Sequence, residues 1–157
     1  KKLFIASLIA GSISAQAANV MAWVAPYDVS RSWTNINTDF GGVGVKDGLT
    51  HLALQFWLPT TSGGLIKDPK YPSHDITDAN IKKFVDWGDA NNVKTLLCVY
   101  NNDGTWNWSL AKAAFASNKT TFINALVTEM ERLNLDGVEI DLFKIINHLK
   151  LNRNGKD

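Results

Sequence analysis

Two carboxylates near the end of the sequence alternate with apolar residues. Glu139 and Asp141 are separated by Ile140 and flanked by Val138 and Leu142. On a strand, successive side chains point to opposite faces, so the two acids share one face and the apolar residues would pack under helices on the other. Carboxylates directed into the centre of a sheet or barrel are costly to bury unless they hydrogen-bond, titrate at a raised pKa or serve chemistry. The spacing alone leaves two interpretations open: acid–base or electrostatic catalysis, or solvated edge-strand acids without a role.

A series of predicted strands and helices leads up to these carboxylates. Four short runs are apolar at nearly every position, which is typical of strands buried on both faces: residues 20–25, 51–57, 94–100 and 137–142. Apolar residues at helical spacing predict helices over residues 78–90, 110–115 and 119–133. Strands and helices in this order form βαβ units around a parallel sheet. Both a doubly wound sheet and part of a (β/α)8 barrel fit the order.

The connections between the strands narrow this choice. Residues 26–30, after the first predicted strand, lack the Gly-rich phosphate-binding fingerprint, which disfavours a nucleotide-binding sheet. The glycines of residues 41–44 precede the second strand and predict a turn. Residues 58–75 hold prolines and glycines without periodicity, so we expect a long loop after the C-terminal end of the second strand. Long loops at that end of a βα barrel commonly line substrate clefts.

The segment around the two acids resembles a known signature. Residues 136–143 read D-G-V-E-I-D-L-F, and the fourth-strand signature of glycoside hydrolase family 18, the chitinases and related endo-N-acetylglucosaminidases, is D-G-x-D-x-D-x-E. Asp136, Gly137 and Asp141 match, Glu139 is a conservative departure, and Phe143 stands where the family has its catalytic Glu. The resemblance extends over about residues 20–143. It implies an α/β fold of the (β/α)8 TIM-barrel family, truncated here to about the first four βα units.

The resemblance also implies a substrate-assisted retaining mechanism. In the family the 2-acetamido oxygen of the sugar attacks the anomeric carbon, the last Glu protonates the leaving oxygen, and the preceding Asp orients the acetamido group. Asp141 would take the orienting role here, with Glu139 behind it as an electrostatic partner and proton-sharing neighbour. Asp136 is the third acid of the motif, and we interpret it as structural, closing the turn into the strand. Phe143 cannot transfer a proton, so the general acid is missing.

Aromatic residues fall mainly at or just beyond the ends of the predicted strands, where flat rings could stack on the sugar faces of chitin or N-acetylglucosamine oligomers. The substrate-binding candidates are Trp23, Tyr27, Trp57, Tyr100 and Trp106, with Gln55 as an inward polar contact on the face of Trp57. The alternative for each ring is ordinary packing in the core or a loop. His51, His74 and His148 lack metal-ligand spacing, so we expect no metal and no cofactor.

The two ends of the chain differ from its body. Residues 1–17 combine Lys1 and Lys2 with a short apolar run and a small-residue cleavage pattern, which predicts a signal peptide and secretion to the extracellular space or periplasm. The apolar run is too short for a retained transmembrane helix, so no membrane association is expected after cleavage.

Residues 144–157 are rich in Lys, Asn, Ile and Leu, and are interpreted either as out-of-frame sequence or as a short amphipathic helix. The lone Cys98 lies in an apolar run and is interpreted as a buried structural residue.

Three hypotheses for function remain. The preferred one is an N-terminal fragment of a secreted chitinase-type hydrolase that is inactive alone, since residues 18–157 are shorter than the roughly 250 residues of a complete barrel. The others are an active enzyme in which Glu139 or a partner chain supplies the acid, and a catalytically dead chitin-binding, lectin-like relative. Residues 18–143 carry 10 bases and 14 acids, which disfavours a nucleic-acid partner. Unpaired apolar edges on the first and fourth strands predict self-association.

Overall fold

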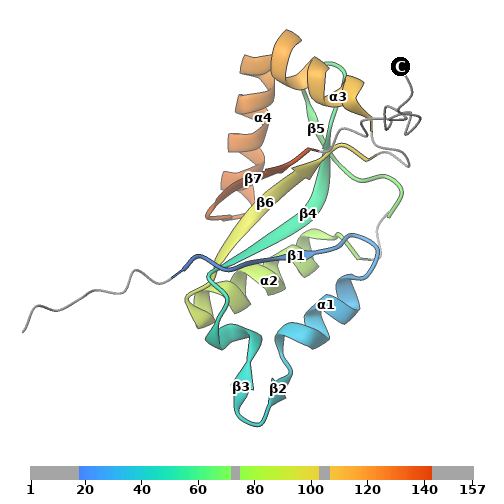
Figure 1. Ribbon diagram of the computed structural model, residues 1–157. Coiled ribbons are helices and arrows are strands. Elements are labelled where there is room, and N and C mark those ends of the chain that lie inside the picture. The colour runs from blue at the N-terminus through green and yellow to red at the C-terminus, as the bar shows by residue number, and fades with distance from the viewer. Residues whose placement is uncertain (1–17, 72–74, 103–106, 143–157) are drawn as a thin grey trace, which may run out of the picture.

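A computed structural model describes residues 18–71, 75–102 and 107–142, and these residues form a five-stranded sheet with helices beside it (Figure 1). The parallel strands follow the order β1-β4-β6-β7. Their bounds are Met21–Val24 for β1, His51–Pro59 for β4, Lys94–Tyr100 for β6 and Gly137–Asp141 for β7. The four predicted strands and their parallel arrangement are thus confirmed, and the carboxyl ends of all four lie at one edge of the sheet.

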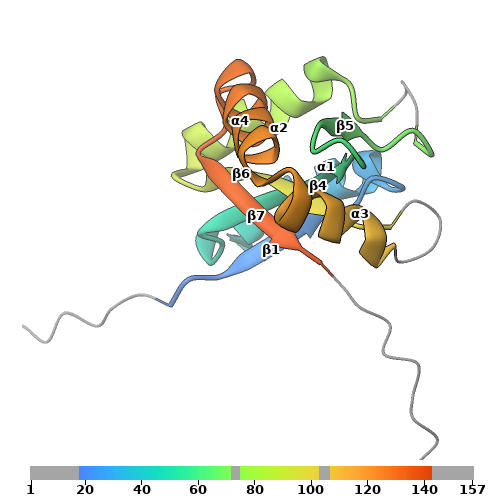
Figure 2. The same ribbon diagram turned by 90° about the horizontal axis from the view of Figure 1, so that it is seen from above.

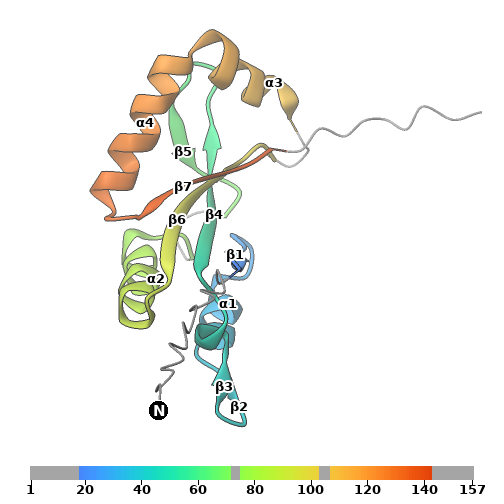
Figure 3. The same cartoon turned by 60° about the vertical axis from the view of Figure 1, so that its left-hand side comes forward.

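The helices connect these strands. They are α1 (Val29–Ile36), α2 (Asp78–Asn91), α3 (Trp108–Lys112) and α4 (Lys119–Arg132), with a π-helical turn, Ala113–Ser117, between α3 and α4. The Thr77 side chain caps α2 by accepting a hydrogen bond from the Asn80 amide. Asn92, in the left-handed conformation, ends the helix. Helices α2 and α4 gather on one face of the sheet (Figures 2 and 3).

Three short strands and a 3-10 helix were not predicted from the sequence. Strands β2 (Asp39–Phe40) and β3 (Val43–Gly44) form an antiparallel hairpin, with a turn in which Gly41 and Gly42 both have positive φ. The predicted glycine turn is therefore confirmed, and a short 3-10 helix, Val45–Asp47, follows it. Strand β5 (Leu65–Lys67) pairs antiparallel with the end of β4. The expectation of an irregular loop over residues 58–75 was therefore wrong in part.

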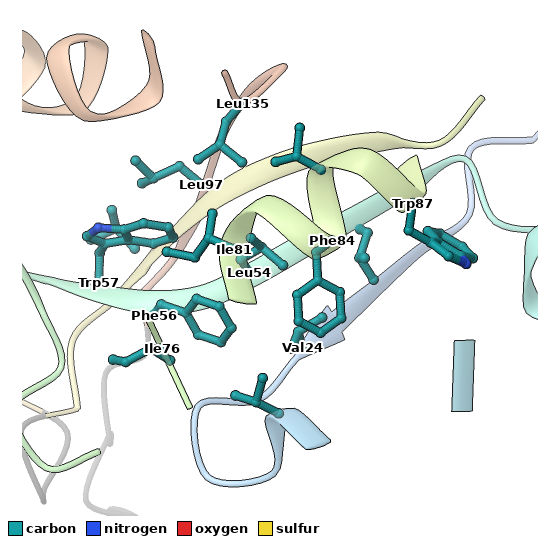
Figure 4. Close-up of a cluster of buried hydrophobic side chains, with 14 of the residues drawn as sticks. Val24, Leu54, Phe56, Trp57, Ile76, Ile81, Phe84, Trp87, Leu97 and Leu135 are labelled. Carbon is teal, nitrogen blue, oxygen red and sulfur yellow. The ribbon is translucent and has the colours of Figure 1, made fainter. Parts of the chain in front are cut away.

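The core lies between the sheet and the helices (Figure 4). Phe84 of α2 is 1% exposed and makes an edge-to-face contact with Trp33 of α1, with ring centroids 5.4 Å apart. Leu54 and Leu97 form a register pair on β4 and β6 beneath α2, and both are fully buried. Burying one such side chain contributes roughly 1.5–3 kcal/mol. This packing fixes the strands whose ends carry the site.

A β-bulge at Phe56 overturns one prediction. Gln55 pairs with Cys98, but the next pair in the ladder is Trp57 with Val99, so β4 carries one extra residue at this point. The extra residue moves Trp57 to the face opposite Gln55, where it is 1% exposed and its indole nitrogen donates to Glu129 of α4 at 3.2 Å. The prediction that Trp57 shares the face of Gln55 is therefore wrong, and Trp57 is a core residue.

The apolar face of β7 is less covered than the sequence indicated. Val138 and Ile140 pair with Leu97 and Val99 and so lie on the helix-facing side of the sheet, yet they are 36% and 39% exposed. Within the described residues β7 is the last strand of the order, so neighbours cover it from one side only. The expectation that these residues pack under helices was thus only partly correct.

Among the described helices, none has the length and apolar character needed to cross a membrane.

Candidate functional site

A cavity of about 310 Å³ opens at the carboxyl ends of the parallel strands. Its lining comes from β4, β6 and β7, from the turn after β1 and from the segment after β5. The lining residues are Pro26, Tyr27, Gln55, Asp68, Lys70, Tyr71, Tyr100, Asn102 and Asp141. Four of the residues singled out from the sequence, Tyr27, Gln55, Tyr100 and Asp141, thus meet in one cavity. In parallel α/β proteins ligands commonly bind at this end of the strands.

Asp141 is the last residue of β7 and lies at the cavity floor. Gln55 of β4 donates from Nε2 to Asp141 Oδ2 at 2.5 Å, across the β6 strand that separates β4 from β7. Partial burial raises the pKa of the Asp141 carboxyl, and the Gln55 hydrogen bond opposes that rise without cancelling it. A carboxyl group held in this way can orient a ligand and exchange a proton closer to neutral pH than an ordinary aspartate.

Glu139 has a different partner from Asp141. Because Cys98 and Glu139 are a register pair on β6 and β7, their side chains share the face of Gln55, and Cys98 Sγ donates to Glu139 Oε2 at 2.6 Å. Cys98 is fully buried, and burial, together with the adjacent Glu139, raises the pKa of its thiol. The predicted burial of Cys98 is therefore confirmed. Glu139 lies behind Asp141 on the strand and does not line the cavity.

Asp136 lies at the opposite end of β7 from the cavity. Its carboxylate accepts hydrogen bonds from the Thr95 amide and from Lys94 Nζ, both at 2.8 Å, at the amino end of β6. Burial alone would raise the pKa of Asp136, but the Lys94 ammonium and the Thr95 amide together hold it below its usual range. Asp141 lies five positions further along the chain, which corresponds to about 16 Å along a strand. Asp136 therefore ties two strands together and is not a residue of the cavity.

The segment after β5 supplies lining residues that the sequence pattern did not single out. Asp68 is 2% exposed and accepts hydrogen bonds from the Tyr100 hydroxyl and, at 2.8 Å, from the Lys70 amide. Burial, followed by the hydrogen bond to Asp68, raises the pKa of the Tyr100 phenol. The Lys70 ammonium lies 5.5 Å from the Tyr71 ring centroid. The only feature of the sequence that pointed to these lining residues was the position of their loop at the carboxyl end of a strand.

The remaining aromatic candidates are placed less uniformly. Tyr27 is 68% exposed and lies 6.3 Å from the Tyr71 ring, measured between centroids. Trp23 is 51% exposed and, as the partner of Ala53, lies on the face of Gln55 nearer the amino end, outside the cavity lining. Trp106 and Phe143 lie outside the described residues, as do residues 1–17, His74 and residues 144–157.

The lining of the cavity is polar and rich in hydrogen-bonding groups. Two carboxylates, two amides and three phenols face one ammonium group in the cavity. Within residues 18–71, 75–102 and 107–142, no group of three or more His, Cys, Asp or Glu side chains is arranged to hold a metal ion. Tyrosine rings beside carboxylates and amides are suited to sugars, which present apolar faces and a rim of hydroxyls.

Several solved structures that resemble this fold are chitinases. A chitinase from Bacteroides thetaiotaomicron matches with a TM-score of 0.61 at 18% identity, over 82% of this chain and 37% of that one. A chitinase from Chromobacterium violaceum ATCC 12472 matches with a TM-score of 0.56 at 17% identity, over 80% of this chain and 35% of that one. The C-terminal domain of a putative chitinase from Desulfitobacterium hafniense DCB-2 matches with a TM-score of 0.59 at 14% identity, over 82% of this chain and 35% of that one. No protein-family model and no curated protein matches the sequence.

These likenesses concern the fold. The described residues have the α/β fold of part of a chitinase barrel, as the resemblance of residues 136–143 led us to expect. The chain spans about a third of the length of the chitinase structures it matches.

Proposed function

We propose that this chain is part of a chitinase-type glycoside hydrolase and that its cavity binds the N-acetylglucosamine units of chitin. The observation that carries the proposal is the placement of Asp141. The motif that resembles family 18 puts this residue at the carboxyl end of β7, where Gln55 holds it in a cavity lined by tyrosines. The chitinase fold of the described residues supports the same assignment.

In the proposed mechanism Asp141 orients the 2-acetamido group of the sugar so that its carbonyl oxygen faces the anomeric carbon. The negative charge of Asp141 then stabilises the positive charge that develops on the acetamido group as the glycosidic bond breaks. Gln55 fixes the carboxylate, and Glu139 contributes its charge from behind, on the same face of β7. The exposed ring of Tyr27 offers a stacking surface for an adjacent sugar.

The proposal includes the absence of turnover by this chain alone. The family pattern places the proton donor at the position of Phe143, and a phenyl group cannot protonate a leaving oxygen. General acid assistance contributes roughly 10²–10⁴-fold in rate. Orientation by Asp141 without proton donation therefore predicts binding without measurable hydrolysis.

A second candidate function is a chitin-binding, lectin-like relative without catalysis. The cavity favours it, because the residues suited to holding a sugar, Tyr27, Gln55 and Asp141, are present together in this chain. The two candidates differ in the affinity for chitin that they require of this chain. A lectin must retain chitin through the residues of this chain alone. For both, the export pattern of residues 1–17 leads us to propose a secreted protein that meets chitin outside the cell.

A pair of measurements on the full chain tests the proposal. We expect no fluorophore release from a fluorogenic N-acetylglucosamine oligomer, and we expect weak binding of the same unlabelled oligomer in a calorimeter. Gln55→Leu should abolish the binding, whereas Lys82→Leu, a change on the exposed surface of α2, should leave it intact. Turnover that disappears in Asp141→Asn would contradict the inactive assignment. Retention on chitin beads with release by soluble oligomer would favour the lectin.

A further inference from the structure

The buried carboxylate of Asp68 in the cavity wall has no role in the mechanism above. It is 2% exposed, in a segment that otherwise lies near the surface, with Lys70 exposed two residues on. Removing a carboxylate from water is costly unless hydrogen bonds compensate it. Asp68 receives two such bonds, from the Tyr100 hydroxyl and from the Lys70 amide. Its own amide donates to the Phe56 carbonyl at 2.8 Å, which fixes the residue against the bulge of β4.

The direction of the bond to Tyr100 determines what that phenol can offer a ligand. A phenol has one proton, and Tyr100 directs that proton to Asp68 Oδ2. Only acceptor lone pairs of the phenol oxygen are then left for the cavity. Because a hydroxyl that donates a hydrogen bond becomes a better acceptor, the carboxylate strengthens this property.

We infer that Asp68 is a positioning residue that fixes the Tyr100 oxygen as a hydrogen-bond acceptor for a hydroxyl or amide hydrogen of the bound sugar. This inference rests on the proposed function. Both residues line the same cavity as Asp141 and Gln55, and Tyr100 is the register partner of Asp141 on the neighbouring strand β6, whereas Asp68 comes from the segment after β5. The rise in the Tyr100 phenol pKa, caused by burial and then by Asp68, agrees with a proton held on the phenol.

The arrangement predicts a selectivity for ligands. A sugar that presents a donor to Tyr100 is accepted, whereas an ether or ester oxygen at the same place would meet acceptor lone pairs and be rejected. Such mismatches are costly because a buried polar atom stays unpaired. An N-acetylglucosamine oligomer should therefore bind more tightly than its fully O-methylated counterpart.

A double-mutant cycle tests the inference. Affinity for a soluble β-1,4-linked N-acetylglucosamine oligomer is measured by calorimetry for the full chain and for Asp68→Asn, Tyr100→Phe and the double variant. We expect each single change to weaken binding about five- to tenfold, the effect of one hydrogen bond. The double variant should be no weaker than either single variant, because Asp68 acts through Tyr100. Asp86→Asn, at an exposed ion pair with Lys82, is the matched control and should bind as wild type.

Ultraviolet titration of the tyrosines measures the ionisation of the Tyr100 phenol, which would not change if Asp68 had only a structural role. In Asp68→Asn the phenol of Tyr100 should ionise at lower pH than in wild type, because the neighbouring negative charge is gone. Additive losses in the cycle, unchanged affinity in both single variants, or an unchanged titration would each overturn the inference and leave the proposed function standing. A wild-type chain that binds no oligomer would overturn both. Thermal unfolding of each variant verifies that it is folded, and Tyr100→Phe tests the acceptor independently of Asp68.

Discussion

At the scale of single residues, one aspartate precedes β7 and another ends it, and their surroundings shift the pKa of the two carboxyls in opposite directions. Partial burial raises the pKa of the Asp141 carboxyl, and the hydrogen bond from the Gln55 amide opposes this rise without cancelling it. Asp136 meets an ammonium and a backbone amide, which together lower the pKa of its carboxyl against the effect of burial. The same residue type is therefore arranged for ligand chemistry at the carboxyl end of β7 and for strand connection just before its amino end.

The two aspartates should differ in how stability depends on pH. The folded chain binds the Asp141 proton more tightly than the unfolded chain, so its stabilising contribution is complete below about pH 4 and is lost as the pH rises through the folded pKa. Asp141→Asn should therefore raise the melting temperature at pH 7 and have little effect at pH 3. For Asp136 the contribution is present above about pH 4 and is lost as the pH falls. Asp136→Asn should lower the melting temperature at pH 7, and equal shifts for both variants would contradict these assignments.

At the scale of elements, the close approach of α2 to β6 fixes the position of the central strand. A Cβ atom on Gly88 of α2 would lie 2.4 Å from Thr95 Oγ1 and 2.6 Å from the Val93 carbonyl oxygen. The backbone carbonyl cannot move aside as a flexible side chain can. Gly88 thus lets the helix lie directly over the start of β6, and β6 in turn holds Tyr100 and Cys98 at the site.

Replacing this glycine should be costly. Gly88→Ala should lower the free energy of unfolding by about 3 kcal/mol, at the upper end of the range for overpacked cores. Gly48→Ala is the matched control, because no atom lies within 4 Å of its added Cβ and its φ is negative. That variant should be neutral or more stable by about 0.5 kcal/mol. Urea unfolding measures both, and similar losses in the two variants would show that the packing of α2 is not the cause.

The sequence predicted the regular parts of these elements and missed their irregularities. The periodicity of residues 78–90 and 119–133 predicted α2 and α4 because each buries an apolar face. The strand faces of Asp141 and Gln55 follow from the sequence because period two holds along each strand up to those residues. It fails after Gln55, where the bulge shifts the ladder, and a pattern of residue types contains no signal for one extra residue. Asp68 was missed for a related reason, since only tertiary contacts bury it.

At the scale of the whole molecule, the sheet has apolar side chains at both ends of its strand order. Trp23 of β1 is 51% exposed, and Val138 and Ile140 of β7 are 36% and 39% exposed. Within the described part of the chain, β1 and β7 each pair with a neighbour on one side only. Unpaired strand edges beside exposed apolar residues favour pairing with another chain. The prediction of self-association therefore has a defined location on β1 and β7.

We expect the purified 157-residue chain to self-associate in solution. Its apparent mass should exceed the 17.3 kDa of a single chain and should rise with concentration. Ile140→Lys should weaken this association about tenfold or more, as expected for a central apolar contact, because a charge on an edge strand opposes pairing. Ile123→Lys is the matched control, since Ile123 is 45% exposed on the helix α4 and does not belong to a strand. Sedimentation equilibrium over a range of concentrations measures both variants. A monomer at every concentration, or the same loss of association in both variants, would show that the strand edges do not drive assembly.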